Sequence, residues 1–420
     1  MLLNHTFAEK ARRLRSDHPD YTYKRSAAAY FEEHGLPKPT HEYYKYTALS
    51  TPWFAQKIQA AAEGEGEMRS VFPHDLDAYR VVLEHGRVVE STLPAALSSK
   101  IAVLSFDQAR HHPYFATHFG KIAPPDSDPL VALNAVGYET GCFVRIAPEA
   151  ALDKSLWLQH RSYRLHEAAC PRTLVIAGRQ SRASVMASWS IGGGVVNAVT
   201  EMVLETGAHL DWYDVQIGLS DCACLLNTTH VVQEKDSLCR AYTLTWSGSV
   251  VRNSWQTFIQ GSGSETHLYG LYCPFATRHI DNATTVDHRR PHSTSNELFK
   301  GLIAGQGTGV FNGRIYVRPE AQKTLAFQAN HNLVLSEKAV LHTKPQLEIW
   351  ADDVKCSHGA TIGKIDPRQL AYLQSRGIPQ AVAVRLLQEA FAAEVIEQVD
   401  WLALRTSLSE NLQNALESLG

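Results

Sequence analysis

The fold prediction for this chain starts from "KTLAFQANHNLVL", residues 323–335. Apolar and polar residues alternate along it, as they do in half-buried β-strands. The runs on either side, "GVFNGRIYV" (309–317) and "AVLHTKPQLEIWA" (339–351), have the same character, and turn-forming residues separate them. Because none of the three shows the apolar spacing of three and four residues typical of a helix, we expect consecutive β-strands here.

The same pattern extends over the middle of the chain, roughly from residue 139 to residue 363. Earlier runs of this kind are "TLVIAG", "LDWYDVQIG" and "LCRAYTLTW". Such a long series of short strands predicts one large all-β unit, and a sandwich, a barrel, a propeller and a β-helix are the alternatives. The sequence has no strict repeat of the kind that propeller blades leave. An irregular solenoid is compatible with that, whereas an ordered repeat array is not.

Helical patterns flank this β-rich region. The stretch before it, 1–138, mixes helical patterns with turns, and "RVVLEHGRVVES" within it reads as two short strands around His85 and Gly86. From Asp366 the chain is helical, with Asp366 expected to cap a helix, Pro367 in its first turn and Gly377 just past its end. The next helix carries an apolar stripe formed by Val384, Leu387, Phe391 and Val395.

We therefore predict a mainly β protein with three domains. They are a mixed, largely helical N-terminal domain (1–138), a β core (139–365) and a C-terminal helical domain (366–420). The apolar stripe of the last domain must be buried, either on the β core or on a partner.

Composition excludes several classes of protein. The chain has 420 residues, 44% of them hydrophobic and 20% charged, which is ordinary for a globular protein. Its formal net charge of -3 argues against a nucleic-acid or acidic-membrane binder. No secretory signal and no membrane-spanning apolar segment is recognisable. The seven cysteines follow no disulfide framework, so we expect a reducing, cytoplasmic location.

Cys356 and His358 are the first candidates for a functional site. Residues two apart in a strand point to the same face, so this thiol and imidazole can meet one ligand. Both are common ligands of zinc, copper and iron-sulfur clusters, but two ligands do not close a site. Any metal here would be shared with another chain or held transiently. The alternative is that this face is core, with Cys356 as a small hydrophobic residue.

Two other groups offer weaker signals. Cys222 and Cys224, with His230 nearby, form a second pair of this spacing, and buried free cysteines are the favoured interpretation. The segment "TTVDHRRPHSTSNELFKG" (284–301) carries His288, Arg289, Arg290 and His292 and is expected to be a solvated surface loop, with an anion or metal patch as the alternative. The chain has no P-loop, no G-x-S-x-G and no H-E-x-x-H motif, so we infer no nucleotide hydrolysis and neither of those hydrolase chemistries.

The C-terminal half resembles a known family. Five unusual motifs carry the resemblance: "GVFNG", "RPEAQKT", "KPQLEI", "ADDVKCSHGAT" and "YLQSRGI". They are similar to motifs of the SufB/SufD family of iron-sulfur cluster assembly scaffolds. Weaker matches, such as "HIDNATTVDH", "FGKIA" and "EYYKYTAL", extend the resemblance over in effect the whole chain. The wording "CSHGAT", the modest length and the N-terminal region resemble the SufD type; the SufB type is the alternative.

The resemblance implies a fold and an assembly. The fold would be a right-handed parallel β-helix between helical N- and C-terminal domains. The chain would pair with a SufB-like paralogue through the β-helix and would recruit a SufC-like ABC ATPase through residues 366–420. Tyr372, Arg376 and Gly377, all in "YLQSRGI", would lie at that ATPase contact. Whether the isolated chain forms a homodimer through the same edge stays open.

The resemblance also implies a role for the Cys-x-His pair. His358 would take part in the assembly of a transient iron-sulfur cluster at the SufB interface, with Cys356 as the second candidate. The chain itself would be a non-catalytic scaffold that binds no ATP, and a reduced flavin is a further candidate ligand of the complex. Two other functions stay as alternatives: a β-helix enzyme acting on polysaccharide, and a purely structural partner in which His358 is only an interface residue.

Overall fold

The computed structural model describes residues 2–64, 72, 76–163 and 168–418 of the chain. Its strands form two sheets. Sheet A contains, in spatial order, β19 (Lys355–Gly363), β17 (Leu325–Val334), β15 (Thr294–Ile303), β13 (Glu265–Tyr272), β11 (Leu238–Thr245), β9 (His209–Leu219), β7 (Arg182–Ile191), β5 (Ser155–Ser162), β1 (Ala78–Glu84) and β2 (Arg87–Ser91). Sheet B contains β18 (Val340–Ile349), β16 (Thr308–Val317), β14 (His279–His288), β12 (Val250–Ile259), β10 (Cys224–Gln233), β8 (Val195–Leu204), β6 (Arg172–Ala177), β4 (Cys142–Ile146) and β3 (Ile101–Ser105).

The helices lie before and after these strands. The N-terminal ones are α1 (Leu2–Arg12), α2 (Tyr21–His34), α3 (Pro52–Glu63), α4 (Phe106–Ala109), α5 (Pro113–His118) and α6 (Pro129–Gly137), with the short 3-10 helices η1 (Glu42–Tyr44) and η2 (Ala95–Leu97). The C-terminal ones are α7 (Pro367–Ser375), α8 (Gln380–Ile396) and α9 (Leu402–Glu417). The predicted cap residues are confirmed: the Asp366 side chain accepts from the Arg368 backbone N–H at 2.8 Å, and Gly377 follows α7 with φ of 82°.

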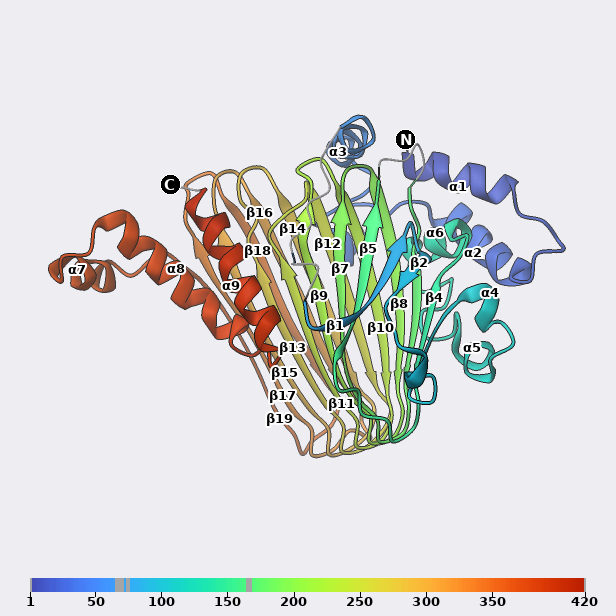
Figure 1. Cartoon of the computed structure of the whole chain (residues 1–420). Helices are drawn as coiled ribbons and strands as arrows, with labels where there is room; N and C mark the ends of the chain where they lie inside the picture. Colours follow the sequence, from blue (N-terminus) through green and yellow to red (C-terminus); the bar gives the residue numbers. More distant parts are fainter. Residues whose placement is uncertain (1, 65–71, 73–75, 164–167, 419–420) are drawn as a thin grey trace.

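The strands wind into a parallel β-solenoid (Figure 1). Consecutive strands from β4 onward alternate between the two sheets, and each pairs in parallel with the strand one coil earlier. The length of a coil is not constant: Cys224 pairs with Val250, whereas Thr308 pairs with Val340, which lies further along the chain from its partner. This variation explains why no strict sequence repeat is visible. The mainly β prediction is confirmed, and among the four architectures the solenoid is correct.

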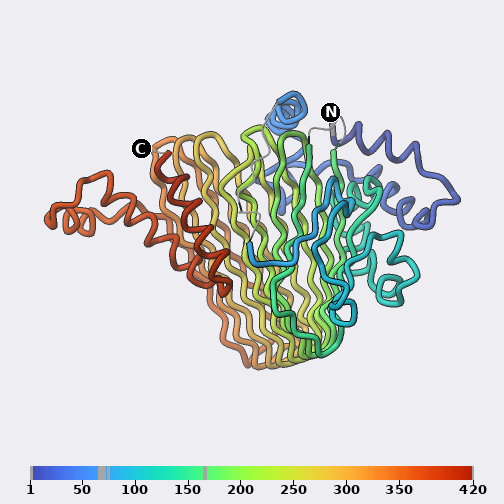
Figure 2. Tube along the Cα trace, viewed as in Figure 1, coloured from blue at the N-terminus to red at the C-terminus, as the bar shows by residue number. Residues whose placement is uncertain are grey.

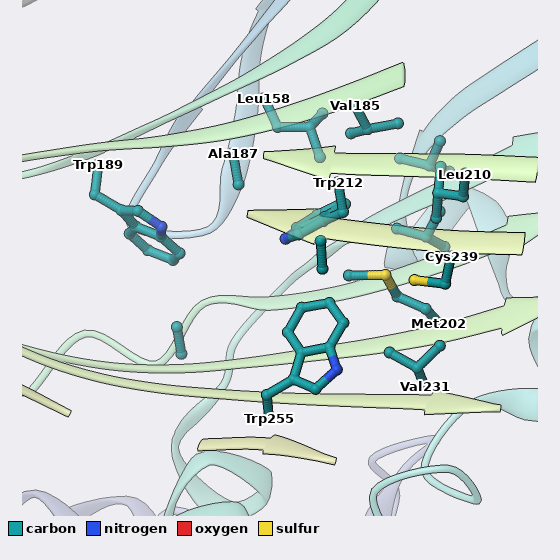
Figure 3. Close-up of a cluster of buried hydrophobic side chains, with 14 of the residues drawn as sticks. Leu158, Val185, Ala187, Trp189, Met202, Leu210, Trp212, Val231, Cys239 and Trp255 are labelled. Carbon is teal, nitrogen blue, oxygen red and sulfur yellow. The ribbon is translucent and has the colours of Figure 1, made fainter. Parts of the chain in front are cut away.

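Apolar side chains fill the space between the sheets in the N-terminal coils. Trp212 on β9 and Trp255 on β12 point toward one another from opposite sheets, with Met202 and Val231 beside them (Figure 3). Both tryptophans are at least nine-tenths buried. Burying this much apolar surface, at about 25 cal/mol per Å², is the main stabilising contribution to the solenoid.

The N-terminal end of the solenoid is covered by its own chain. β1 pairs in parallel with β5, and β3 pairs antiparallel with β4, so both of these early strands extend the sheets. The connection between β2 and β3 places Leu93 and Leu97 against the buried interior cluster. The predicted turn between the first two strands is confirmed, with His85 and Gly86 at φ of 50° and 91°.

The C-terminal helices pack on the outer face of sheet A. The ring of Trp401 lies 6.3 Å from that of Tyr213, and Lys300 donates to the Phe391 carbonyl oxygen at 3.0 Å. Val395 from the predicted stripe is fully buried, while the other three members are half-buried. α7 extends away from the solenoid, beyond α8 (Figure 2). In the described part of the chain, no helix combines the length and apolar character needed to cross a bilayer.

Candidate functional site

The last coil of the solenoid is uncovered. β18 and β19 are the terminal strands of sheets B and A, and no strand among the described residues pairs with their outer edges. Ile349 and Ile362 pair with the buried residues Val317 and Asn332 of the preceding coil, and therefore face the interior. Nevertheless, they are 40% and 59% exposed. The solenoid thus has an open end, which consists of the interior-facing residues and free edges of β18 and β19.

Cys356 and His358 lie on β19 at this open end. They pair with Ala326 and Gln328 on β17, both of which are buried and face the interior. The two side chains therefore share the interior-facing side of the last coil, as the spacing predicts. His358 is exposed, because no further coil covers it.

The core interpretation holds in part for Cys356. Its side chain is half-buried and packs against the small cluster that includes Ala326 and Ala351. Burial raises the pKa of the Cys356 thiol above its ordinary value, while a backbone hydrogen bond from Ala326 acts in the opposite direction. At neutral pH the thiol is therefore protonated, and a metal would have to displace its proton on binding.

The other cysteine pair does not form a comparable site. Cys224 is fully buried, and burial raises the pKa of its thiol to about 12. His230 is also buried, and its Nδ1 lies 3.0 Å from the carbonyl oxygen of Ile122. Across the described ranges, no group of three or more histidine, cysteine and acidic side chains is arranged to hold a metal ion. The interpretation of Cys224 as a buried free cysteine is confirmed.

The prediction of a solvated loop at His288 was wrong. His288 is the last residue of β14 and is fully buried, with its two ring nitrogens 2.7 and 2.8 Å from the hydroxyls of Ser293 and Ser295. Burial lowers the pKa of His288 to about 4. The polar residues around His288 suggested a loop, but the strand continues to this residue and its side chain faces the interior. The neighbouring Arg289 side chain is partly exposed and donates to Asp287 at 2.8 Å.

The predicted ATPase-contact residues are on or just after α7. No residue of α7 is buried, and Tyr372 is 58% exposed. The guanidinium of Arg376 lies 5.3 Å from the centre of the Tyr372 ring, a cation–π distance. Gly377 has no atom within 4 Å of the position that a Cβ would occupy. The three residues therefore form one exposed surface at the tip of the C-terminal helices, away from the solenoid interior.

Sequence reasoning missed two buried polar residues behind His358. Gln328 and Glu297 occupy the same interior column of sheet A, one and two coils before His358. They are distant from it in the sequence, and the register of the coils is needed to relate the three residues. No local motif could have found them.

The fold and the open end define a class of protein: a parallel β-solenoid whose last coil, uncovered by any described residue, carries a thiol and an imidazole. A family model described as "SUF system FeS cluster assembly, SufBD core domain" matches residues 160–391, and one described as "SufBD protein N-terminal region" matches residues 5–158. The chain belongs to this SufB/SufD family of iron-sulfur cluster assembly proteins, as the resemblance predicted.

The relatives indicate the SufD type. The chain is 28% identical over 380 residues to "Iron-sulfur cluster assembly protein SufD" of Escherichia coli, which covers 86% of this chain and 85% of the relative. It is 34% identical over 214 residues to a SufBD family protein of Synechocystis sp., covering 51% and 47% of the two chains. A SufBD family protein of Mycobacterium leprae is 33% identical over 239 residues, covering 54% and 59%. The alignments with the last two thus span about half of each relative. The chain is a SufD-type member of the family.

Proposed function

We propose that this chain is a non-catalytic scaffold subunit that pairs with a SufB-like paralogue through the open end of its solenoid. The uncovered last coil carries this proposal. Interior-facing apolar residues such as Ile349 and Ile362 are largely exposed in the isolated chain, although the equivalent positions one coil earlier are fully buried. A partner that continues the coil would bury them and gain the corresponding hydrophobic free energy.

The free edges of β18 and β19 support the same mode of pairing. An unpaired edge presents a row of backbone N–H and C=O groups that can bind a strand of another chain. Here both sheets end at the same place, so a second solenoid of similar cross-section could add to both edges at once. A SufB-like paralogue has that shape if it shares the family fold.

In the proposed complex, His358 contributes an imidazole to a nascent iron-sulfur cluster, and Cys356 is the second candidate ligand. Thiolate and imidazole are the side chains that bind such clusters in proteins. The remaining ligands would be thiolates of the partner, so the site is complete only in the complex. The cluster is cargo that must leave, and a mixed, shared ligand set would release it more readily than a closed cage of four cysteines.

The C-terminal helices are the proposed docking site for a SufC-like ABC ATPase. Tyr372, Arg376 and Gly377 form an exposed surface on and just after α7, a helix in which no residue is buried. A helix without buried residues gains little from its own fold, so a partner surface is the simplest reason for its exposed aromatic side chain. ATP would bind to that subunit and not to this chain.

Two further candidates rest on the resemblance alone, a reduced flavin bound in the complex and a homodimer of the isolated chain through the open end. A cytoplasmic location is proposed from the cysteine pattern. A homodimer would use the same edges as the proposed heterodimer, so the two would compete.

The test is co-expression of this chain with SufB-like and SufC-like partners from the same source, followed by anaerobic reconstitution with iron and sulfide. His358→Ala is compared with wild type and with His331→Ala. His331 lies one coil earlier on the outer face of sheet A, where its Nδ1 is 2.9 Å from the Thr361 hydroxyl, and so serves as a matched control. We expect an intact complex in all three cases and loss of cluster absorbance only in His358→Ala.

Two results would contradict the proposal. If the wild-type chain forms no complex, the proposed partners are wrong. If the complex forms and cluster absorbance is unchanged in His358→Ala, the chain is architectural and the cluster chemistry belongs to the partner.

A further inference from the structure

A column of polar residues leads from the interior of the solenoid to His358. In sheet A, Glu297 on β15 pairs with Gln328 on β17, and Gln328 pairs with His358 on β19. The parallel register places the three residues on successive coils at the same level and on the same, interior-facing side. Glu297 is fully buried and Gln328 is 3% exposed.

The hydrogen bonds of Glu297 fix the orientation of the Gln328 amide. The Thr284 hydroxyl donates to one Glu297 carboxylate oxygen at 2.6 Å, and Nε2 of Gln328 donates to the other at 3.2 Å. Because a carboxyl oxygen of Glu297 accepts this hydrogen bond, the amide nitrogen of Gln328 faces Glu297 and the amide oxygen points away from it. Gly313 leaves room for this arrangement, because a Cβ there would collide with Nε2 of Gln328.

This orientation leaves the amide oxygen of Gln328 without a donor. Oε1 is buried and has no hydrogen-bond partner among the described residues. A buried acceptor without a partner costs about 1–3 kcal/mol, so it calls for an explanation. The next side chain in the column is His358, whose imidazole always carries at least one N–H donor.

We propose that Gln328 positions His358 by accepting its imidazole N–H at Oε1, and that Glu297 holds Gln328 in the required orientation. The inference rests on the proposed function, in which His358 is a ligand of the nascent cluster. A neutral imidazole that donates through one ring nitrogen has its lone pair on the other. The hydrogen bond therefore selects the tautomer and turns the free nitrogen toward the open end, where the cluster would form. Second-layer partners of this kind are usual for metal-binding histidines.

The first measurement leaves Gln328 and Glu297 unchanged. The full-length chain is labelled with 15N in its histidine rings, the His358 signals are assigned by their loss in His358→Ala, and the tautomer is read from the ring nitrogen shifts above the pH at which the ring is neutral. We expect one predominant tautomer. A mixture of tautomers like that of a free imidazole would overturn the inference.

Variants then separate positioning from a merely structural role. Gln328→Met keeps the size of the side chain but removes the acceptor, and Glu297→Leu removes the group that orients the amide. In both, we expect His358 to lose its tautomer preference. Glu297→Gln can still accept from Nε2 of Gln328 and donate to the Thr284 hydroxyl, so it should retain the preference. Gln216→Met removes another fully buried amide, several coils away, and should leave His358 unchanged.

The lifetime of the cluster in the reconstituted complex gives a second readout. We expect Gln328→Met to shorten it by about 10-fold or more, the effect typical of second-layer partners of metal ligands. If His358→Ala abolishes the cluster but Gln328→Met changes neither the tautomer nor the lifetime, this inference fails and the proposed function survives. If His358→Ala itself has no effect on the cluster, the proposed function fails first.

Discussion

The two ends of the solenoid differ in how far their interior-facing residues are exposed. At the N-terminal end, Ile101 on β3 is 2% exposed, and the connection that carries Leu93 and Leu97 lies against the interior. At the C-terminal end, Ile362 on β19 is 59% exposed, although it occupies the same kind of interior-facing position. The described residues thus cover the N-terminal end of the core and leave its C-terminal end uncovered.

This difference indicates where a partner belongs. Edge strands and apolar interior residues are usually covered or blunted with charge, because they promote association. In this chain the first end follows that rule, and the second does not. Cys356 and His358 also lie at the uncovered end, so the proposed pairing surface and the proposed cluster site coincide.

The same substitution at both ends of the solenoid tests whether they differ in packing. Ile101→Ala should lower the free energy of unfolding by about 2–5 kcal/mol, because it leaves a cavity in packed core. Ile362→Ala should change it by no more than about 0.5 kcal/mol, because its side chain is already largely in solvent. Urea unfolding of both variants checks the prediction. Equal losses would mean that the open end is packed in the isolated chain.

Buried carboxylates in the two halves of the solenoid differ in their hydrogen-bond partners. In the N-terminal half, Glu201 is paired with the fully buried Arg172, whose Nη2 lies 2.8 Å from its carboxylate. Near the open end, Glu297 accepts hydrogen bonds from the neutral side chains of Thr284 and Gln328, and burial raises its pKa to about 7. Between its unfolded pKa and pH 7, the native state therefore binds more protons than the unfolded state, and the stability falls as the pH rises.

Glu297→Gln isolates this contribution, since the amide cannot ionise. Between pH 5 and pH 8 the variant should gain on the order of 3 kcal/mol of stability relative to wild type, because the unfolded carboxyl loses its proton over a lower pH range than the native one. Urea unfolding at a series of pH values measures the difference. A difference that does not vary with pH would show that Glu297 is ionised at the same pH in the native and unfolded chain.

The smallest expected effect on binding comes from a substitution in the C-terminal helices. Here too, a buried surface on α8 and α9 differs from an exposed surface on α7. Tyr372→Ala should leave the unfolding free energy unchanged, since α7 has no buried residue, but should weaken binding of a SufC-like ATPase by about 10-fold or more, equivalent to about 1.4 kcal/mol. Tyr163→Ala, which truncates a 44% exposed tyrosine near the N-terminal coils, is the control and should bind normally. Titration calorimetry with the ATPase distinguishes the two. Equal affinities for all three proteins would place the docking site elsewhere.

The sequence was informative where the signal is local. Alternation predicted the strands, and Asp366 and Gly377 correctly marked the limits of a helix, since caps depend on one or two residues. The solenoid could not be separated from other all-β folds by residues alone, because the length of a coil varies along the chain and leaves no fixed repeat. The role of His358 stays a prediction that rests on the family resemblance, because its spacing to Cys356 alone left the core interpretation open.

Features that depend on the register between coils could not be predicted from the sequence. Gln328 and Glu297 lie in one column with His358 only because three strands of sheet A align, and no local pattern relates them. His288 was misplaced for a similar reason: its polar neighbours suggested a loop, whereas the preceding strand continues and turns its ring toward two serines.

If the open end is the pairing surface, a charge placed there should prevent pairing. The dissociation constant of the complex with a SufB-like partner would be measured for wild type, Ile362→Lys and Val89→Lys. Val89 on β2 is 49% exposed at the edge of the opposite end, so it offers a matched control. We predict that Ile362→Lys weakens the complex by at least about 100-fold, through the cost of burying an unpaired charge, and that Val89→Lys has no effect. Unchanged affinity in Ile362→Lys, or an equal loss in both variants, would contradict the account.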